Sequence, residues 1–144
     1  MTEESVRAVV EASETAWKQS NLDQIAQYNA PNCIINSTAP QPDGTINNVT
    51  KSCLQTIDLM RTNLAQMKKN GVTYKYDSTA PKIAVLGGKA TARFSATISL
   101  SNAKMSLVTV SDQVETLQLI KGKMRIAAVD AKTTSITVDG QRKF

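Results

Sequence analysis

Apolar residues near the start of the chain recur at the spacing of amphipathic helices. Between Thr2 and Asn21 they form one helical face, which consists of Val6, Val9, Val10, Ala16 and Trp17 together with Ser13. Thr2 can cap this helix. The triplet Asn21-Leu22-Asp23 interrupts the pattern, and Asn21 followed by Gln24 predicts the start of a second, short helix that Pro31 ends.

A third helix is predicted over residues 53–70. Its apolar positions repeat at intervals of four and three, at Cys53, Ile57, Met60, Leu64 and Met67. Lys68 and Lys69 complement the negative end of the helix dipole, and Asn70-Gly71 can end the helix in a left-handed conformation. Before this helix, residues 33–35 predict a short strand, and the Asn-, Pro- and Ser-rich residues 36–48 predict a loop.

Alternation with period two dominates after Gly71 and predicts strands. In the clearest case, Ala90, Ala92, Phe94, Ala96, Ile98 and Leu100 alternate with Thr91, Arg93, Ser95, Thr97 and Ser99. Gly87-Gly88 predicts the hairpin turn that precedes this strand. Further strands are predicted over residues 72–76, 82–86, 105–120 and 123–131, with a bulge near Ser111-Asp112, and residues 132–144 are expected to form a tail.

The amino-acid composition limits the classes of protein to which this chain can belong. A chain of 144 residues suits one domain and can fold without a metal or a disulfide. Aromatic residues make up only 4%, so aliphatic residues and alanine are expected to build most of the core. No apolar run approaches the ~20 residues of a membrane-spanning helix. The acidic N-terminus lacks the apolar segment of a signal peptide, so a cytoplasmic location is expected; the alternative is a periplasmic or secreted protein whose signal peptide has been removed.

The formal net charge of +5 could favour nucleic acid or anionic lipid as a partner. However, the basic residues are single or paired, as at Lys68-Lys69 and Arg142-Lys143, and aromatic residues are not interleaved with them. This distribution favours a solvated basic surface. We therefore expect neither a nucleic-acid nor a membrane partner.

The chain has two cysteines, Cys33 and Cys53, and no histidine. The cysteine spacing fits no zinc or redox motif, and no histidine can complete a metal site, so neither a metal nor a cofactor is expected. The sequence favours two buried free thiols. A Cys33–Cys53 disulfide is the alternative, and it would imply an oxidising compartment.

Three stretches of the chain carry a family resemblance. Residues 17–23 (WKQSNLD) are similar to a helix–break–helix signal, residues 28–35 (YNAPNCII) to a passage from a helix into a first strand, and residues 119–126 (LIKGKMRI) to a last hairpin. In this order they resemble the nuclear transport factor 2-like superfamily, which includes SnoaL-like polyketide cyclases and ketosteroid isomerases, although tryptophan is common there at the position of Met124. The resemblance implies one domain over residues 1–131. Its fold class is α+β, with three N-terminal helices packed on a strongly curved antiparallel sheet that forms a cystatin-like cone around a pocket.

The resemblance also implies that familiar catalytic groups of this superfamily are missing. The position of the steroid-isomerase base falls at Asn36 or Ser37, and the position of its oxyanion tyrosine falls at Ser13. Only the second oxyanion donor is matched by an acid, near Glu115. Histidine-dependent dehydratase or cyclase chemistry is excluded because the chain has no histidine.

What remains is a candidate pair of acids, Glu115 and Asp130. Glu115 shares a predicted strand face with Leu117, and Asp130 shares one with Ile126 and Ala128. If both faces are concave, the two carboxyl groups converge in an apolar cavity, share a proton and could perform acid–base catalysis. The alternative is that both are solvated structural charges, since a register slip of one residue turns either side chain outward.

Three functions follow from these observations. The first is a binding domain for a small apolar molecule, with a pocket lined by Trp17, Met60, Leu64, Tyr76, Leu117 and Ala128. The second is an isomerase, dehydratase or epoxide-hydrolase-like enzyme that uses Glu115 and Asp130. The third is a dimeric protein-interaction module. The resemblance further implies a homodimer that forms through the polar convex face of the sheet.

Overall fold

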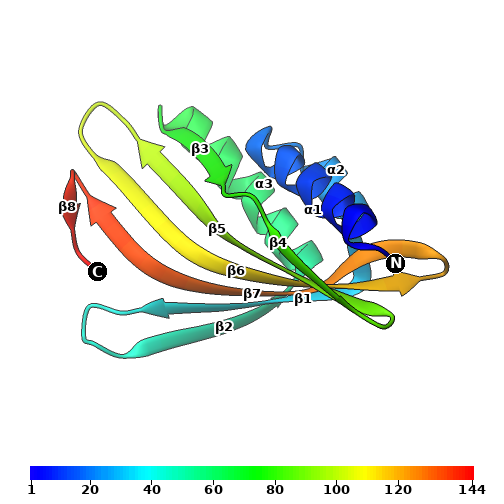
Figure 1. The fold of residues 1–144 in the computed structure, drawn as a ribbon. Coiled ribbons are helices and arrows are strands. Elements are labelled where there is room, and N and C mark those ends of the chain that lie inside the picture. Colours follow the sequence, from blue (N-terminus) through cyan, green and yellow to red (C-terminus); the bar gives the residue numbers. More distant parts are fainter.

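The computed structural model describes all 144 residues as three helices and eight strands (Figure 1). The helices are α1 (Glu3–Lys18), α2 (Leu22–Tyr28) and α3 (Cys53–Lys69). The strands are β1 (Asn29–Pro40), β2 (Ile46–Ser52), β3 (Thr73–Ser78), β4 (Lys82–Leu86), β5 (Lys89–Ser101), β6 (Ser106–Ile120), β7 (Lys123–Val138) and β8 (Gln141–Arg142). The predicted helix break and the third helix are confirmed. No helix is long and apolar enough to cross a membrane.

Polar side chains fix where the helices begin. The Thr2 side chain accepts a hydrogen bond from the backbone N–H of Ser5, and the Asn21 side chain accepts one from Gln24. Both bonds satisfy an N–H group that has no partner inside its helix. The capping residues identified in the sequence therefore start α1 and α2 as predicted.

The strands form one curved sheet in the order β2-β1-β7-β6-β5-β3, with β4 beside β5 and β8 beside β7. β1 runs parallel to β7, and the other pairs are antiparallel. Figure 1 shows that the strands curl and that the three helices lie together on one side of the sheet. The predicted α+β fold class, three helices packed on a strongly curved sheet, is confirmed, but the sheet is not wholly antiparallel as predicted, because β1 and β7 run parallel. The sheet side toward the helices is called the inner face below, and the opposite side the outer face.

Two apolar clusters hold the helices in place. The larger cluster joins Val6 and Val10 of α1 to the inner face of the sheet, where it includes Phe94, Leu117 and Ile126. It also contains the small residues Ala90, Ala92 and Ala96 of β5. The smaller cluster joins the three helices through Ala16, Leu22, Ile25 and Ile57. Aliphatic residues and alanine thus build most of the core, as the composition predicts.

Two regular segments extend further than the sequence predicts. Residues 36–48 are not one loop, because β1 continues to Pro40 and β2 begins at Ile46. These two exposed strands are linked by hydrogen bonds between polar side chains, Thr38 with Asn48 and Thr50 with Asn36. They therefore lack the apolar alternation by which strands are recognised in a sequence. Residues 132–138 are likewise no tail, since β7 continues to Val138 and pairs with β6. An irregularity does occur at the place predicted near Ser111-Asp112, but the extra residue is Thr134 of β7, since Val110 pairs with Ser135 and Ser111 with Thr133.

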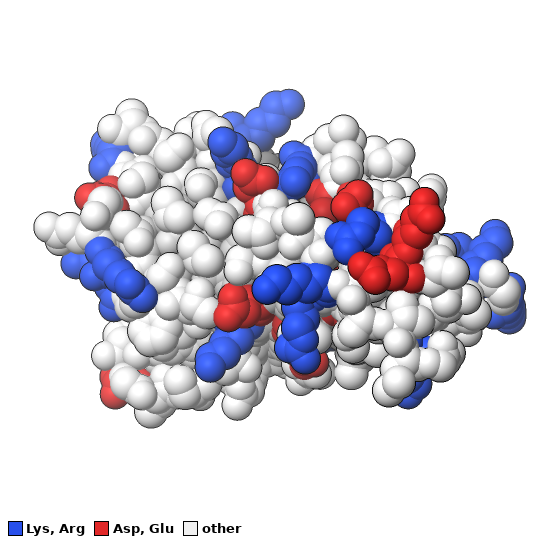
Figure 2. All heavy atoms as spheres, in the orientation of Figure 1, with Lys and Arg blue, Asp and Glu red and all other residues white.

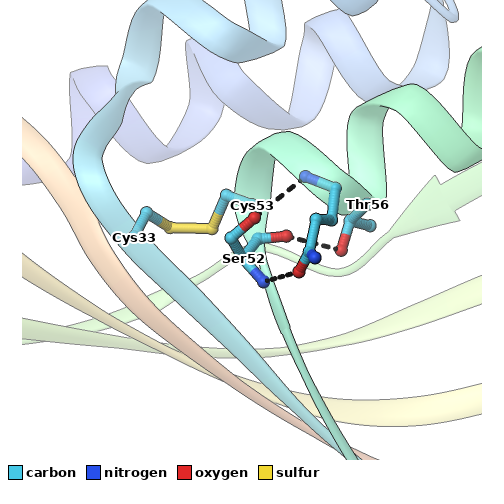
Figure 3. The surroundings of a disulfide bond; sticks show 5 residues. Cys33, Ser52, Cys53 and Thr56 are labelled. Carbon is cyan, nitrogen blue, oxygen red and sulfur yellow. Dashed lines mark hydrogen bonds between the residues drawn. A yellow bond between two sulfur atoms is a disulfide. The ribbon is translucent and has the colours of Figure 1, made fainter.

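The prediction of two free thiols is wrong. Cys33 of β1 and Cys53, the first residue of α3, form a disulfide (Figure 3), and their Cα atoms are 5.3 Å apart. The cause is the β1–β2 hairpin, in which Ile34 pairs with Ser52 and brings the flanking cysteines together. Because that hairpin was predicted to be a loop, free thiols were favoured over the alternative of a Cys33–Cys53 disulfide. The bond ties the start of α3, which Ser52 also caps, to β1.

Removing the disulfide is expected to lower the free energy of unfolding by about 3 kcal/mol, because the bond closes a loop between residues 20 positions apart. Urea unfolding of an oxidised sample of the wild type and of a Cys33→Ala/Cys53→Ala variant measures this difference. A reducing agent should destabilise the wild type similarly and leave the double variant unchanged. Two freely alkylated thiols in the oxidised, folded wild type would contradict the assignment.

Candidate functional site

Two acidic side chains are buried between α1 and the sheet. Glu14 of α1 is 5% exposed and Glu115 of β6 is 4% exposed. Glu115 pairs with Ala92 and Val129 on the inner face of the sheet. Glu14 lies four residues after Val10 and three before Trp17, and therefore at the border of the apolar helix face. The helix face predicted from the sequence does not include Glu14, although this spacing was the available signal for its burial.

Tyr76 of β3 holds Glu14 in position. Its hydroxyl donates a hydrogen bond of 2.5 Å to Oε1 of Glu14. The Tyr76 ring packs against Trp17, with the ring centres 5.9 Å apart and the planes tilted by 31°. The interior between α1, β3 and β6 therefore holds two carboxyl groups beside an aromatic pair.

Three buried polar atoms in the same region have no hydrogen-bond partner. They are the Ser13 hydroxyl oxygen on α1, the Tyr74 hydroxyl oxygen on β3 and Oε1 of Glu115 on β6. Ser13 is 1% exposed, so water from the bulk solvent does not reach it freely. We call the group of Ser13, Glu14, Trp17, Tyr74, Tyr76 and Glu115 the acid–aromatic site.

Burial and mutual repulsion control the protonation of this site. Burial and the nearby Glu14 carboxylate raise the pKa of Glu115 from 4.5 to about 8. Burial also raises the pKa of Glu14, while hydrogen bonds from Tyr76 and Ser78 and the charge of Lys18 oppose that rise. The pKa of Tyr74 is raised to about 12 by burial and by Glu14. Near neutral pH, Glu115 is therefore a neutral carboxylic acid and both tyrosines keep their protons.

A polar pocket lies beside Glu14. Its volume is about 340 Å³, and it is lined by Glu11, Glu14, Thr15, Lys18, Ser78, Thr79, Ala80 and Pro81. These residues come from α1, from the end of β3 and from the connection between β3 and β4. The Lys18 ammonium at this pocket lies 3.6 Å from the Asp77 carboxylate, and both side chains are largely exposed. Glu14 is thus the residue through which the buried acids meet the surface.

The predicted convergence of Glu115 and Asp130 is wrong. Asp130 pairs with Val114, whereas Glu115 pairs with Val129, so the two acids lie on opposite faces of the sheet. Asp130 is exposed on the outer face, where it accepts a hydrogen bond of 3.2 Å from the Asn36 side-chain amide.

A bulge in β7 explains this difference. Leu117 pairs with Ile126 and Thr116 pairs with Ala128, so Ala127 is an extra residue in β7 with no pairing partner on β6. An extra residue reverses the alternation of side chains beyond it. Ile126 therefore stays on the inner face, while Ala128 and Asp130 turn to the outer face.

The six residues predicted to line an apolar pocket do not come together. Tyr76 and Trp17 belong to the acid–aromatic site, and Leu117 is fully buried in the larger apolar cluster. Met60 and Leu64 pack on the smaller cluster between the helices, and Ala128 lies on the outer face. Five surface pockets have volumes of about 200 to 500 Å³, and their linings include none of Trp17, Met60, Leu64 and Leu117.

Charged residues of both signs are mixed on the surface. Figure 2 shows basic and acidic side chains next to one another on the face in view, with white surface between the groups. Ion pairs such as Arg7 with Glu3 and Arg61 with Asp23 contribute to this mixing. The absence of a nucleic-acid partner nevertheless stays a prediction from the sequence.

Comparison with known proteins identifies the fold. No protein-family model matches the sequence, and no curated protein is significantly similar to it. Among solved structures, a conserved protein from Planctomyces limnophilus superposes with a TM-score of 0.69 at 11% identity, over 92% of this chain and 95% of that chain. A nuclear transport factor 2-like protein with a cystatin-like fold from Novosphingobium aromaticivorans gives a TM-score of 0.66 at 12% identity, over 90% and 80% of the two chains.

A nuclear transport factor 2-like protein of unknown function from Shewanella oneidensis extends the same pattern. Its TM-score is 0.57 at 16% identity, over 92% of this chain and 99% of that chain. Identities this low show the fold alone. The chain therefore has the cystatin-like cone fold of nuclear transport factor 2-like proteins, as its sequence resemblance implies.

The raised pKa of Glu115 predicts that stability depends on pH. In the folded protein this pKa is about 8, against 4.5 for an ordinary glutamate, so the folded state keeps a proton that the unfolded chain releases between these values. Relative to a Glu115→Gln variant, the wild type should be most stable below about pH 4.5. Its relative stability should fall by at most about 1.4 kcal/mol per pH unit as the pH rises toward 8, and then level off. Urea unfolding at a series of pH values measures this difference.

Asp130→Asn is the matched control, because it neutralises an exposed acid on the opposite face. Its stability should run nearly parallel to that of the wild type over the same pH range. If the curve for Glu115→Gln also runs parallel to the wild type, Glu115 does not hold a proton in the folded state.

Proposed function

We propose that this chain is a small-molecule-binding domain and that the acid–aromatic site is its binding site. The observation that carries the proposal is the set of three unpartnered polar atoms on Ser13, Tyr74 and Glu115. Leaving a buried polar group unsatisfied costs about 1–3 kcal/mol. A ligand that supplies hydrogen bonds to these atoms recovers that cost.

The surroundings of these atoms support a ligand with both polar and apolar parts. Trp17 and Tyr76 supply aromatic groups, and a surface pocket reaches the site at Glu14, the one residue of the site in its lining. The ligand predicted from the sequence was apolar, but the lining of this pocket is almost entirely polar. We therefore assign the polar end of the ligand to Glu14 and Glu115 and its apolar part to the aromatic pair.

The enzyme alternative loses its geometric basis. It required Glu115 and Asp130 to act together on one substrate, and the two acids lie on opposite faces of the sheet. The side chain of Asp130 is instead engaged with Asn36. A homodimer through the outer face stays compatible with ligand binding, because it leaves the acid–aromatic site free.

A fragment screen tests the proposed function. A library that includes cationic, anionic and neutral aromatic fragments is added to ¹⁵N-labelled protein, and amide and indole NMR signals are followed. Bound fragments should shift the signals of Ser13, Glu14, Trp17 and Glu115, because these residues surround the site. Trp17 is a specific reporter, since it is the single tryptophan of the chain.

Two variants make this screen decisive. Glu115→Leu removes one unpartnered polar atom without opening the core, and it should weaken the binding of hits by about tenfold or more. Asp130→Asn should bind them like the wild type. Hits that bind Glu115→Leu undiminished, or shifts confined to the outer face of the sheet, would show that the acid–aromatic site is ordinary core.

A further inference from the structure

The acid–aromatic site contains two carboxyl groups and no basic side chain of its own. Buried acids are usually paired with a cation. Lys18 is the basic residue that acts on Glu14, but its ammonium lies at the surface beside Asp77. Arg7, also on α1, is engaged with the Pro81 carbonyl and with Glu3. The buried carboxyl groups therefore lack an internal counterion.

The hydrogen-bonding groups of the site are also incompletely used. An ionised Glu14 only accepts hydrogen bonds, whereas the hydroxyl groups of Ser13 and Tyr74 and the protonated Glu115 can both donate and accept. Tyr76 donates to one oxygen of Glu14, whereas Oε1 of Glu115 receives no donor. A ligand carboxylate or phosphate would add negative charge and no donor.

We infer that the ligand bound at this site is a small organic amine in its protonated, ammonium form. The inference rests on the proposed function and names the class of its ligand. An ammonium group supplies the positive charge that the site lacks, and its three N–H groups can donate to the unpartnered oxygens of Ser13, Tyr74 and Glu115. The aromatic pair Trp17–Tyr76 adds a favourable surface for a cation or for the hydrocarbon part of the amine.

The pocket beside Glu14 suits such a ligand. Glu11 and Glu14 place negative charge at its lining, and its volume of about 340 Å³ is of the size that small ligands occupy. Lys18 also lines it, but the ion pair with Asp77 partly neutralises this charge. A metal ion is the poorer occupant, because no three side chains of the types that bind metals gather anywhere in the structure.

Binding of an ammonium ion should release a proton from the site. Near neutral pH, Glu115 is kept protonated by burial and by Glu14. A cation between the two acids favours the charged form of both, so Glu115 ionises as the ligand enters. The other charged or titratable groups that face the site are Lys18 on α1 and Tyr74 and Tyr76 on β3. The neighbours of Glu115 on β5 and β7, Ala92 and Val129, do not titrate.

Calorimetry with three probes of similar shape tests this inference. The probes are benzylamine, benzyl alcohol and benzoate, which carry a positive charge, no charge and a negative charge. Benzylamine should bind at least about tenfold more tightly than benzyl alcohol, since hydrogen bonds to charged groups contribute about 1.5–3 kcal/mol, and benzoate should bind least. Titrations in buffers with different ionisation enthalpies should show release of up to about one proton at pH 7 and less above pH 8.

Glu115→Gln and Asp130→Asn are compared as a matched pair of neutralised acids. Glu115→Gln should lower the affinity for benzylamine by about tenfold or more and abolish proton release. Asp130→Asn should retain both properties. Circular dichroism and thermal unfolding confirm that each variant is folded before it is titrated.

The outcomes separate the ammonium inference from the proposed function. If benzyl alcohol binds as tightly as benzylamine and both are weakened by Glu115→Leu, the site binds small molecules but the ammonium inference is wrong. If benzylamine binds Glu115→Gln with undiminished affinity and proton release, the inference is likewise wrong. If no probe binds at millimolar concentration, the inference fails, and the fragment screen then decides whether the site binds any molecule at all.

Discussion

The burial of Glu115 beside Glu14 without a basic partner is the constraint on which the properties of the site depend. A carboxyl group in an apolar interior must find a cation, find donors or keep its proton. Tyr76 supplies a donor to Glu14, and no residue supplies one to Oε1 of Glu115. Glu115 therefore keeps its proton near neutral pH, and this proton is the one that a cationic ligand would displace. The protonation of Glu115 and the proposed preference for a cationic ligand thus have the same physical origin.

The rest of the fold positions these two acids. Val6 and Val10 pack α1 against the small alanines of β5, so Glu14 on the same helix lies over the inner face of the sheet. The smaller cluster around Ala16 and Ile25 joins α1 to α2 and α3. The disulfide then ties the start of α3 to β1. Each restraint acts on a helix at a different place, and together they limit how far α1 can move from the sheet.

The sequence predicts the elements better than it predicts which way their side chains point. Periodic apolar positions and capping residues identify the three helices, because helix formation depends on local spacing. Side-chain direction in β7 depends instead on Ala127, whose bulge arises from pairing with β6 and leaves no mark in the alternation. The disulfide was missed for a similar reason, since the hairpin that joins Cys33 to Cys53 is made of polar residues that resemble a loop. The burial of Glu14 was not predicted because this residue lies at the edge of the apolar helix face.

The register of the sheet also decides which acids can take part in chemistry at one site. Asn36, which stands at a position where steroid isomerases carry their base, is on the outer face, where it bonds Asp130 and Thr50. These three polar side chains link β7, β1 and β2. They are hydrogen-bonded to one another, as is typical of a structural network. The inner face has the opposite character, because Oε1 of Glu115 has no hydrogen-bond partner there. A fold shared with many proteins therefore places the chemically unsatisfied groups of this chain on α1, β3 and β6, and a ligand that binds in its interior must complement those groups.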